Sequence, residues 1–574
     1  MIYKKKPSTE IELKTIRSIH QAIKEYDKKI SFEKIKPISI GGLFKLITLR
    51  DKIILFIGII LSVLIIFRLN YIIKYERVFL QSKQDNNVIR NIPIIQARGG
   101  IFDRNGLGLA VSTPINELYI NKKQYDIKNN ESFQKILKKY NLNFDLNKFT
   151  KNSYISRNLT PEQGDKFKNI DIKGVIVLEN YKRFYPLGNS ISNLLGKTNI
   201  DDFGIDGIEY SYNNYLKSDN GNQKITKTLK GDVVDFNITK QSISGSNLKL
   251  TINSDFQITS YRLLMEQVKQ SNAKGGAVII LDAKTGEILA MTSYPSLNPN
   301  IQINSSYKKQ EDPTYQTVFD PGSIMKPLVI AKAIDDKKVL PTTILNTTPY
   351  RVGTKIIKDD HPMNSMSVSQ IIQFSSDIGT SKIALMYKPQ DLYNYYKSLG
   401  FGTKTGLHLN GETKGILNNY KRWMPMDQAL MSFGYGISIT LLQIASSYTI
   451  FTNNGCILKP KLIYNNKPSA CLPLISPKTT NIMRDILEST VTNGTAKKAG
   501  SSNFSVAGKT GTAQKLINGR YVSNAHVASF VGFAPVKNSK YIVAVMIDEP
   551  KNGYYASSTA APLFQKIMTY IINK

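Results

Sequence analysis

Two side chains with the chemistry of an acyl-transfer site lie three residues apart in the middle of the chain. Ser323 and Lys326 follow a turn at 320–322 and precede an apolar stretch, 328–334, which predicts both near a helix N-terminus. The spacing puts them on one helix face. A serine attacks when a neighbour takes its proton, and a lysine can do so when burial lowers its pKa. Alone, S-x-x-K is a weak signal, because a solvated helix start also produces it.

Two further motifs follow along the chain. Ser375 and Asp377 lie between two helix-like runs, and a predicted strand carries Lys509-Thr510-Gly511-Thr512. S-x-x-K, then S-x-N or a near variant, then K-T-G-T, in this order, is the pattern of penicillin-recognising acyltransferases. Each piece is common, whereas the ordered set of three is specific.

Competing sites fail on local residues. Gly508-Lys509-Thr510 resembles the end of a phosphate-binding loop, but Asn503 occupies the position of the earlier glycine. Ser323 lacks the G-x-S-x-G context of a Ser-His-Asp hydrolase, and we interpret His361 as structural. The four histidines are far apart in sequence, so no metal site is expected.

Beyond these motifs, the chain resembles the class B penicillin-binding proteins, and within them the division-specific, FtsI-like peptidoglycan transpeptidases. The resemblance covers nearly everything from the apolar segment near residue 53 to the C-terminus. The segment 296–300 favours the septal branch over the elongation branch. The other matching segments are R-G-x-I-x-D-R-x-G at 98–106, R-x-Y-P-x-G at 183–188, G-x-x-G-x-E at 204–209, Trp423, and 432–436.

The resemblance implies acyl transfer on peptidoglycan stem peptides that end in D-Ala-D-Ala. Ser323 would be the nucleophile, Lys326 its base, and Ser375 a proton relay to the leaving amine. Lys509 would add positive charge, and β-lactams would acylate Ser323. Thr510, Gly511 and Thr512 would bind the substrate, and no cofactor is implied. The implied partners are a membrane glycosyltransferase and other division proteins.

Asp377 departs from the family pattern, which has asparagine at this position. An asparagine side chain both accepts and donates hydrogen bonds, whereas an ionised aspartate only accepts. A carboxylate between two lysines also favours their protonated forms, which opposes the use of Lys326 as a base. A second hypothesis is therefore a catalytically weak, membrane-anchored scaffold of the wall-synthesis machinery. Ser501-Ser502-Asn503 spells the missing motif but lies out of order, so we reject it as a replacement.

An apolar segment near the N-terminus predicts a membrane anchor. Residues 53–67 carry no charge, and the stretch reaches about 32 Å when extended to residue 73, if Arg68 snorkels to the headgroups. No small-residue cleavage site follows, which argues against a cleaved signal peptide. Residues 1–52 contain 13 Lys and Arg against six acids, so this tail is expected in the cytoplasm.

The net charge of +33 over 574 residues suits an anionic partner, although a general bias toward lysine, asparagine and isoleucine explains it equally well. Export of the large C-terminal part excludes nucleic acid as the partner. We expect an inner-membrane protein with a cytoplasmic N-terminus and a periplasmic bulk that contacts lipid through its anchor.

The predicted fold class is α+β (mixed α/β). We expect a basic tail (1–52), an anchor (53–73), an elongated mixed pedestal (74–245) and a transpeptidase domain (246–574). In the pedestal, a strand is predicted at 92–97, a hairpin turns at Asn105-Gly106, and a capping box begins a helix at Thr160. In the last domain, hairpins at 276–292 and 528–547 predict a central antiparallel sheet flanked by helices.

Two cysteines, Cys456 and Cys471, are the only ones in the chain and flank a probable hairpin. They can pair in an oxidising periplasm, and two buried free thiols are the alternative.

Overall fold

The computed structural model describes residues 49–76, 89–170, 172–227, 233–301 and 311–574. The chain divides into two compact units, one containing the described residues up to Arg90 with Lys224–Phe236, and one containing 91–223 and 237–574. The unit boundaries fall within strands β1 (Ile89–Ile94), β6 (Gly221–Lys227) and β7 (Val233–Lys240). All but the last four residues of the expected tail, 1–52, lie outside the described residues.

The smaller unit contains the expected apolar anchor. Helix α3 (Leu49–Tyr71) continues as a π-helical turn, η1 (Ile72–Glu76). Among the described residues, Ile53–Glu76 is the one helical segment long and apolar enough to cross a bilayer, with a mean hydropathy of 2.6 and no buried residue in its most apolar window. Arg68, the first charged residue of this segment, pairs with Glu76 at 3.4 Å. The ion pair draws the guanidinium toward the C-terminal end of the helix, where headgroups would solvate it.

The pedestal part of the larger unit is built on a sheet in the order β4-β3-β2-β8, with β5 also paired to β3. The turn at Asn105-Gly106 joins β2 and β3 as expected, since Ile101 lies opposite Ala110. The strand expected at 92–97 ends at Ile94, because the Gln96 amide donates instead to the Asn220 side chain. The strand bounds are β2 (Ile101–Phe102), β3 (Gly108–Ile120), β4 (Ser153–Leu159), β5 (Val175–Phe184) and β8 (Leu248–Lys249).

Helices α5 (Asn130–Lys139) and α6 (Pro161–Lys168) cover part of this sheet. The capping box predicted at Thr160 is confirmed, because Thr160 and Gln163 exchange side chain to backbone hydrogen bonds at 3.2 and 3.0 Å. Both helices bury their apolar faces in one cluster with β3. Its members include Leu118, Ile120, Phe133, Leu137 and Phe167. The short helices α7 (Ser192–Leu195), α8 (Gly207–Ser211) and α9 (Asn213–Leu216) follow.

A buried ion cluster joins the three pedestal motifs. Glu209 accepts from Arg98 and from Arg183, each at 2.7 Å, and the three side chains are at most 2% exposed. Gly99 follows Arg98 in the chain. A Cβ atom added at Gly99 would lie 2.0 Å from the Ser246 carbonyl oxygen. Asp103 accepts from the Ser254 hydroxyl at 2.8 Å and so ties the pedestal to the transpeptidase part. The pedestal motifs are therefore scaffold.

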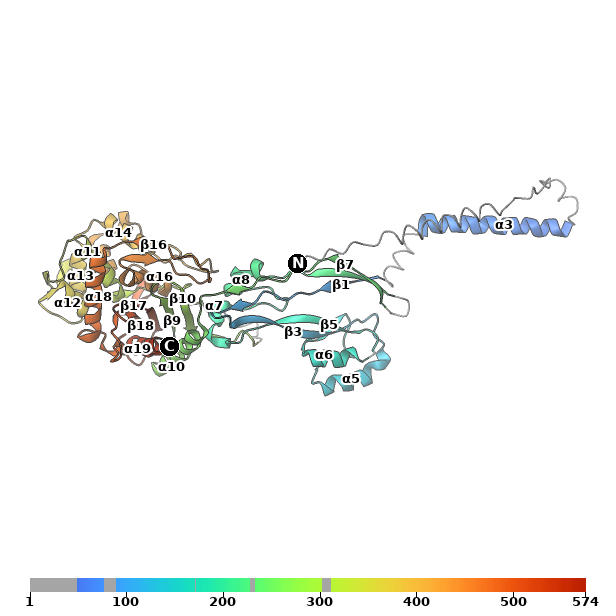
Figure 1. Ribbon diagram of the computed structural model, residues 1–574, viewed down its shortest axis with the longest axis horizontal. Helices are drawn as coiled ribbons and strands as arrows, with labels where there is room; N and C mark the ends of the chain where they lie inside the picture. Colours follow the sequence, from blue (N-terminus) through green and yellow to red (C-terminus); the bar gives the residue numbers. More distant parts are fainter. Residues whose placement is uncertain (1–48, 77–88, 171, 228–232, 302–310) are drawn as a thin grey trace, which may run out of the picture. The chain divides into compact units, whose positions relative to one another are not determined.

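The C-terminal part of the larger unit contains an antiparallel sheet in the order β10-β9-β19-β18-β17, of which Figure 1 labels β9, β10, β17 and β18. Both expected hairpins are confirmed, and β9 pairs with β19, so the two ends of the domain meet in one sheet. The strand bounds are β9 (Gly275–Asp282), β10 (Ile288–Tyr294), β17 (Ala507–Ile517), β18 (Arg520–Ala534) and β19 (Tyr541–Asp548).

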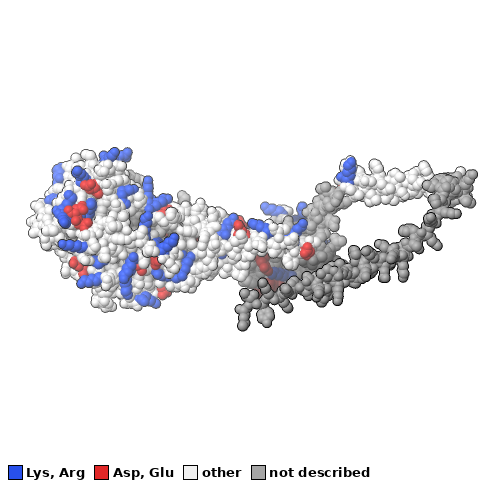
Figure 2. All heavy atoms as spheres, turned by 45° about the horizontal axis from the view of Figure 1, so that its top comes forward, with Lys and Arg blue, Asp and Glu red and all other residues white. Residues whose placement is uncertain are grey.

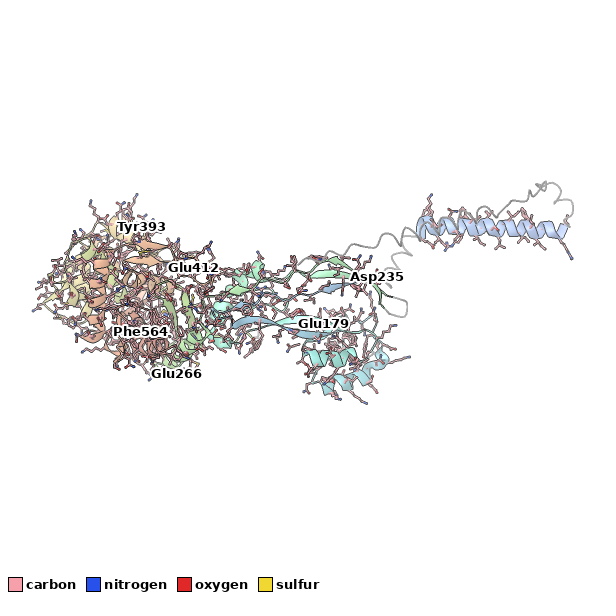
Figure 3. The ribbon with its side chains drawn as sticks, in the orientation of Figure 1. Glu179, Asp235, Glu266, Tyr393, Glu412 and Phe564 are labelled. Atoms are coloured by element: carbon pink, nitrogen blue, oxygen red, sulfur yellow. A yellow bond between two sulfur atoms is a disulfide. The ribbon has the colours of Figure 1, made fainter. Side chains whose placement is uncertain are left out.

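Both faces of this sheet are buried. Alternate residues of a strand point to opposite faces, and in β9 the side chains of Ile279 and Ile280 enter different core clusters. Helices α10 (Ser254–Gln270) and α19 (Ala560–Ile572) cover the face that Ile280 shares with Phe564, which is labelled in Figure 3. Helices of the middle of the domain cover the other face, so the sheet is a rigid support for β17.

The middle of the domain contains helices and short hairpins. The helices are α11 (Lys326–Asp335), α12 (Val368–Gln373), α13 (Asp377–Ala384), α14 (Pro389–Ser398), α15 (Pro425–Ser432), α16 (Leu441–Ser447), α17 (Thr449–Thr452) and α18 (Pro477–Thr492). The short strands are β11 (Ile344–Asn346), β12 (Tyr350–Val352), β13 (Lys355–Ile357), β14 (Ser365–Ser367), β15 (Cys456–Leu458) and β16 (Cys471–Pro473).

A disulfide joins Cys456 and Cys471 across the β15–β16 hairpin. The pairing of these cysteines is the first of the two expected alternatives, and neither cysteine is a free thiol. Positive side chains are dispersed over the face of the larger unit shown in Figure 2 and do not gather in one patch. This distribution fits a compositional origin of the net charge better than a single docking site for an anion.

Removing the carboxylate of the pedestal ion cluster is expected to destabilise the fold strongly. Glu209→Ala leaves two guanidinium groups buried without a counterion, which costs about 3–5 kcal/mol of unfolding free energy. Thermal unfolding of the purified full chain measures the effect.

Glu179→Ala is the matched control, because Glu179 on β5 forms an exposed pair with Lys168 at 2.8 Å (Figure 3). Its loss is expected to cost less than about 1 kcal/mol. Equal losses of stability in the two variants would contradict the scaffold role of Glu209.

Candidate active site

Ser323 lies in a short 3₁₀ helix, η4 (Gly322–Met325), which runs directly into α11. The sequence predicted a plain helix start, whereas the structure has a tighter turn. Side chains three residues apart eclipse in a 3₁₀ turn, so Ser323 and Lys326 still share one face. Gly322 adopts φ +59°, and a Cβ there would lie 3.2 Å from the Ala513 side chain. The glycine therefore lets the nucleophile turn press against β17.

Lys326 is fully buried and is oriented by three oxygen atoms. In the described part of the chain, its Nζ donates to the Ser375 carbonyl at 2.5 Å and to the Ser375 hydroxyl at 3.1 Å, and contacts Asp377 Oδ1 at 2.6 Å. These contacts bring the first and second motifs together. They also hold the ammonium against Ser375 and Asp377.

Ser375 lies between α12 and α13 with a φ of +65°. Non-glycine residues rarely adopt this conformation, and strained backbone of this kind concentrates at functional sites. It places both the carbonyl and the hydroxyl of Ser375 within reach of Lys326. The same hydroxyl accepts from Lys509 Nζ at 2.9 Å, so one oxygen joins all three motifs.

Strand β17 carries the third motif along the site. Lys509 is fully buried and also donates to the Thr510 carbonyl at 3.1 Å. The Thr510 hydroxyl lies 3.3 Å from that of Thr495, and the Thr512 hydroxyl accepts from the Ala556 amide at 3.1 Å. A Cβ on Gly511 would lie 2.8 Å from the Pro321 carbonyl oxygen. Glycine is required there so that the strand can approach the nucleophile turn.

The carboxyl of Asp377 and the amine of Lys509 are both perturbed. Burial raises the pKa of Asp377, the nearby Asp359 and Asp360 raise it further, and Lys326 opposes the rise. The side chain of Asp377 is nevertheless 32% exposed. Burial and the charge of Lys326 hold the pKa of Lys509 well below its usual range, against a smaller opposing effect of Asp377.

Asp359 supports the second motif, and the sequence analysis assigned it no role. Its carboxylate accepts from the Ser376 hydroxyl at 2.5 Å and from the Ile378 amide at 2.9 Å. Ser376 in turn caps α13 by accepting from the Gly379 amide. The two residues hold the start of α13, and with it Ser375 and Asp377. No local signal identifies Asp359, because a loop, β14 and α12 separate it along the chain from its partners Ser376 and Ile378.

Asp320 supports the nucleophile turn in a similar way. Its carboxylate accepts from the Ser438 and Tyr521 hydroxyls, both at 2.7 Å. It therefore connects η4 to the loop before α16 and to the outer part of β18. The sequence predicts a turn at Asp320, but these partners are remote along the chain and carry no local signal.

Other predicted features lie outside this constellation. His361 is exposed, and Ser502 is exposed in a loop before β17. Within the residues that the structure describes, no group of three His, Cys, Asp or Glu side chains could hold a metal ion.

Comparison with known families gives two matches. Residues 276–569 match the penicillin binding protein transpeptidase domain, and residues 93–250 match the penicillin-binding protein dimerisation domain.

Curated relatives are similar over most of their length. The chain is 34% identical to the probable peptidoglycan D,D-transpeptidase PenA of Neisseria meningitidis, over 86% of this chain and 87% of the relative. It is 33% identical to the peptidoglycan D,D-transpeptidase FtsI of Buchnera aphidicola, over 92% and 95%. It is 32% identical to FtsI of Escherichia coli K12, over 85% of each chain.

A solved structure shares the fold. A mycobacterial penicillin binding protein 3 in complex with aztreonam superposes with a TM-score of 0.66 at 23% identity, covering 84% of this chain and 97% of that one.

Loss of the Asp359 carboxylate is expected to loosen α13. Asp359→Ala removes two hydrogen bonds that organise the helix start, and we expect a loss of about 1–3 kcal/mol in unfolding free energy, measured by thermal unfolding. Asp360→Ala, which removes an exposed neighbour, is the control and is expected to change stability by less than about 0.5 kcal/mol. A larger effect of the Asp360 change would contradict the capping role of Asp359.

Proposed function

Because the chain belongs to the class B, FtsI-like penicillin-binding proteins, the peptidoglycan D,D-transpeptidases, we propose that Ser323 is the nucleophile with which it cross-links stem peptides. The Ser323 oxygen attacks the carbonyl carbon of the penultimate D-Ala, and the terminal D-Ala leaves as a free amine. The resulting ester reacts with the amine of a neighbouring stem, which forms the cross-link and frees Ser323.

One observation carries this proposal: the Ser375 hydroxyl lies within hydrogen-bond distance of both Lys326 and Lys509. These residues come from three motifs far apart in sequence, and their meeting at one oxygen beside the Ser323 turn supports a proton-transfer centre. Ser375 and the two lysines move a proton from Ser323 to the leaving amine. Asp377 holds the Lys326 ammonium.

Strand β17 is proposed to bind the substrate. The hydroxyls of Thr510 and Thr512 hold the terminal carboxylate, and Gly511 leaves room for the substrate backbone. The backbone N–H groups of Ser323 and Thr512 form the oxyanion hole, a contribution of about 3–4 kcal/mol per donor in enzymes of this kind. β-Lactams present the same carbonyl to Ser323 and remain attached as an ester.

The scaffold alternative rested on Asp377 alone. In the structure Asp377 forms an ion pair within an otherwise complete constellation, and nothing there favours a non-catalytic role.

We also propose the domain boundaries and the side of the membrane on which each part of the chain lies. We assign 1–52 to the cytoplasm, 53–73 to the inner membrane, 74–245 to a periplasmic pedestal and 246–574 to the transpeptidase domain. The excess of lysine and arginine in the tail supports this orientation. The FtsI-named relatives support work in cell division. The proposed partners are a membrane glycosyltransferase and other division proteins.

Labelling with a fluorescent penicillin tests the nucleophile. We expect one adduct per chain on the peptide that contains Ser323, and its complete loss in Ser323→Ala, read by gel fluorescence and peptide mass. Ser502→Ala removes an exposed serine of the rejected S-S-N sequence and is expected to label like the wild type. A chain that folds correctly but retains no drug at Ser323 would refute the proposed function.

Protease treatment of intact spheroplasts tests the orientation. Because the transpeptidase domain is proposed outside the inner membrane, it is expected to be digested while a tag on the N-terminal tail is protected. Protection of the C-terminal part with digestion of the tail would reverse the topology.

A further inference from the structure

The site buries two lysines around a single contacting carboxylate. The side chains of Lys326 and Lys509 are fully buried, and both nitrogens touch the Ser375 hydroxyl. They therefore lie within two hydrogen-bond lengths of each other. Two ammonium groups this close in a buried site repel strongly, so the protonation of one opposes that of the other.

The carboxylate is not shared equally between them. Asp377 Oδ1 lies 2.6 Å from Lys326 Nζ, whereas the partners of Lys509 are the Ser375 hydroxyl and the Thr510 carbonyl, both neutral. A buried charge is retained when it is paired, and an unpaired one is relieved by loss of the proton. The geometry therefore distinguishes a paired ammonium at Lys326 from an unpaired amine at Lys509.

We propose that, in this chain, the proton of Ser323 is taken up by a neutral Lys509 acting through the Ser375 hydroxyl, while Lys326 remains an ammonium that positions Ser375. This inference rests on the proposed function and changes the base that sequence alone assigned to Lys326. The depressed pKa of Lys509, caused by burial and by the charge of Lys326, agrees with it, whereas burial raises the pKa of Asp377 and works against the pairing. The 2.6 Å contact between Asp377 and Lys326 is the observation that carries the assignment.

Ser375 has the hydrogen-bonding capacity for this role. A hydroxyl donates once and accepts twice. Its oxygen lies 3.1 Å from Lys326 Nζ and 2.9 Å from Lys509 Nζ, so when Lys509 is neutral the hydroxyl can accept from Lys326 and turn its own proton to the lone pair of Lys509. The second interaction of Lys509, with the Thr510 carbonyl, uses one of the remaining N–H groups. The positive φ of Ser375 holds the hydroxyl between the two nitrogens.

The proton transfers balance. As the bond forms between Ser323 Oγ and the substrate carbonyl carbon, the Ser323 proton passes to Ser375 and the Ser375 proton passes to Lys509. When the carbon–nitrogen bond breaks, the proton returns from Lys509 through Ser375 to the leaving amine. The net charge of the two lysines and Asp377 is the same before and after acylation.

Chemical replacement of each lysine tests which amine takes the proton. Lys509→Cys and Lys326→Cys, alkylated with 2-bromoethylamine, place a side chain of lysine length with a less basic amine. The native cysteines are joined in a disulfide, so only the introduced thiol reacts under non-reducing conditions. Ser323 acylation by a fluorescent penicillin is then followed against pH in the full chain.

The amine that takes the proton sets the acidic limb of the rate profile, because acylation requires its neutral form. We expect the limb to move to lower pH with the analogue at 509 and to stay in place with the analogue at 326. The charged groups facing Lys509 from the packed elements are Lys326 and Asp377, with Asp359 and Asp360 behind them. A shift with the analogue at 326, or no shift with the analogue at 509, would overturn the inference.

The Asp377 carboxylate is the proposed cause, so its removal provides the matched control. In Asp377→Asn, the pairing that holds Lys326 as an ammonium is gone, and the pH shift is expected with the analogue at 326 instead. An unchanged pattern in this background would refute the role of Asp377.

Arginine substitutions provide a measurement that needs no alkylation, because a guanidinium keeps its charge but does not accept a proton. Lys509→Arg is expected to slow acylation by about 10²–10⁴-fold, and Lys326→Arg by a smaller factor. The opposite ranking would overturn the inference while leaving the proposed function intact. Absence of any adduct on the wild-type Ser323 would instead negate the proposed function.

Discussion

The Ser375 hydroxyl is the contact on which the candidate site depends. It receives one lysine from the helix that follows the nucleophile and another from the edge strand of the sheet. Each of these groups comes from a different part of the domain. The rest of the domain serves to hold this oxygen in place, because a shift of about 1 Å in such a constellation is enough to impair catalysis.

Two kinds of support hold it. The sheet is buried on both faces, so β17 and Lys509 have little freedom to move. Carboxylates hold the other segments of the site. Asp359 organises the start of α13, and Asp320 connects the turn before Ser323 to the loop before α16 and to β18. The apolar sheet supplies rigidity, and the carboxylates supply orientation.

Asp377 places a carboxyl group where the family pattern has an amide, which changes the electrostatics of the site. It reaches Lys326 as a neutral asparagine would, but it brings a charge into a site with two buried lysines. One negative charge can balance one ammonium, and its position decides which lysine is paired.

Much of the fold was predictable because its signals are local. The capping box at Thr160 and the turn at Asn105-Gly106 depend on neighbouring residues, and the structure has both of them. The hairpins at 276–292 and 528–547 were predicted from local signals in the same way. The strand expected at 92–97 ends earlier, at Ile94, and the Gln96 amide that follows it donates to a distant side chain, Asn220.

The order and identity of the three motifs were sufficient to name the reaction class and to propose the reacting residues. Tertiary structure alone decided how they meet: that the hydroxyl of Ser375 lies between two lysines, that Asp377 pairs with Lys326 and not with Lys509, and that Asp359 supports them. Sequence spacing carries chemical identity, but charge state depends on burial and on distances between side chains that are remote along the chain. These quantities exist only once the chain has folded.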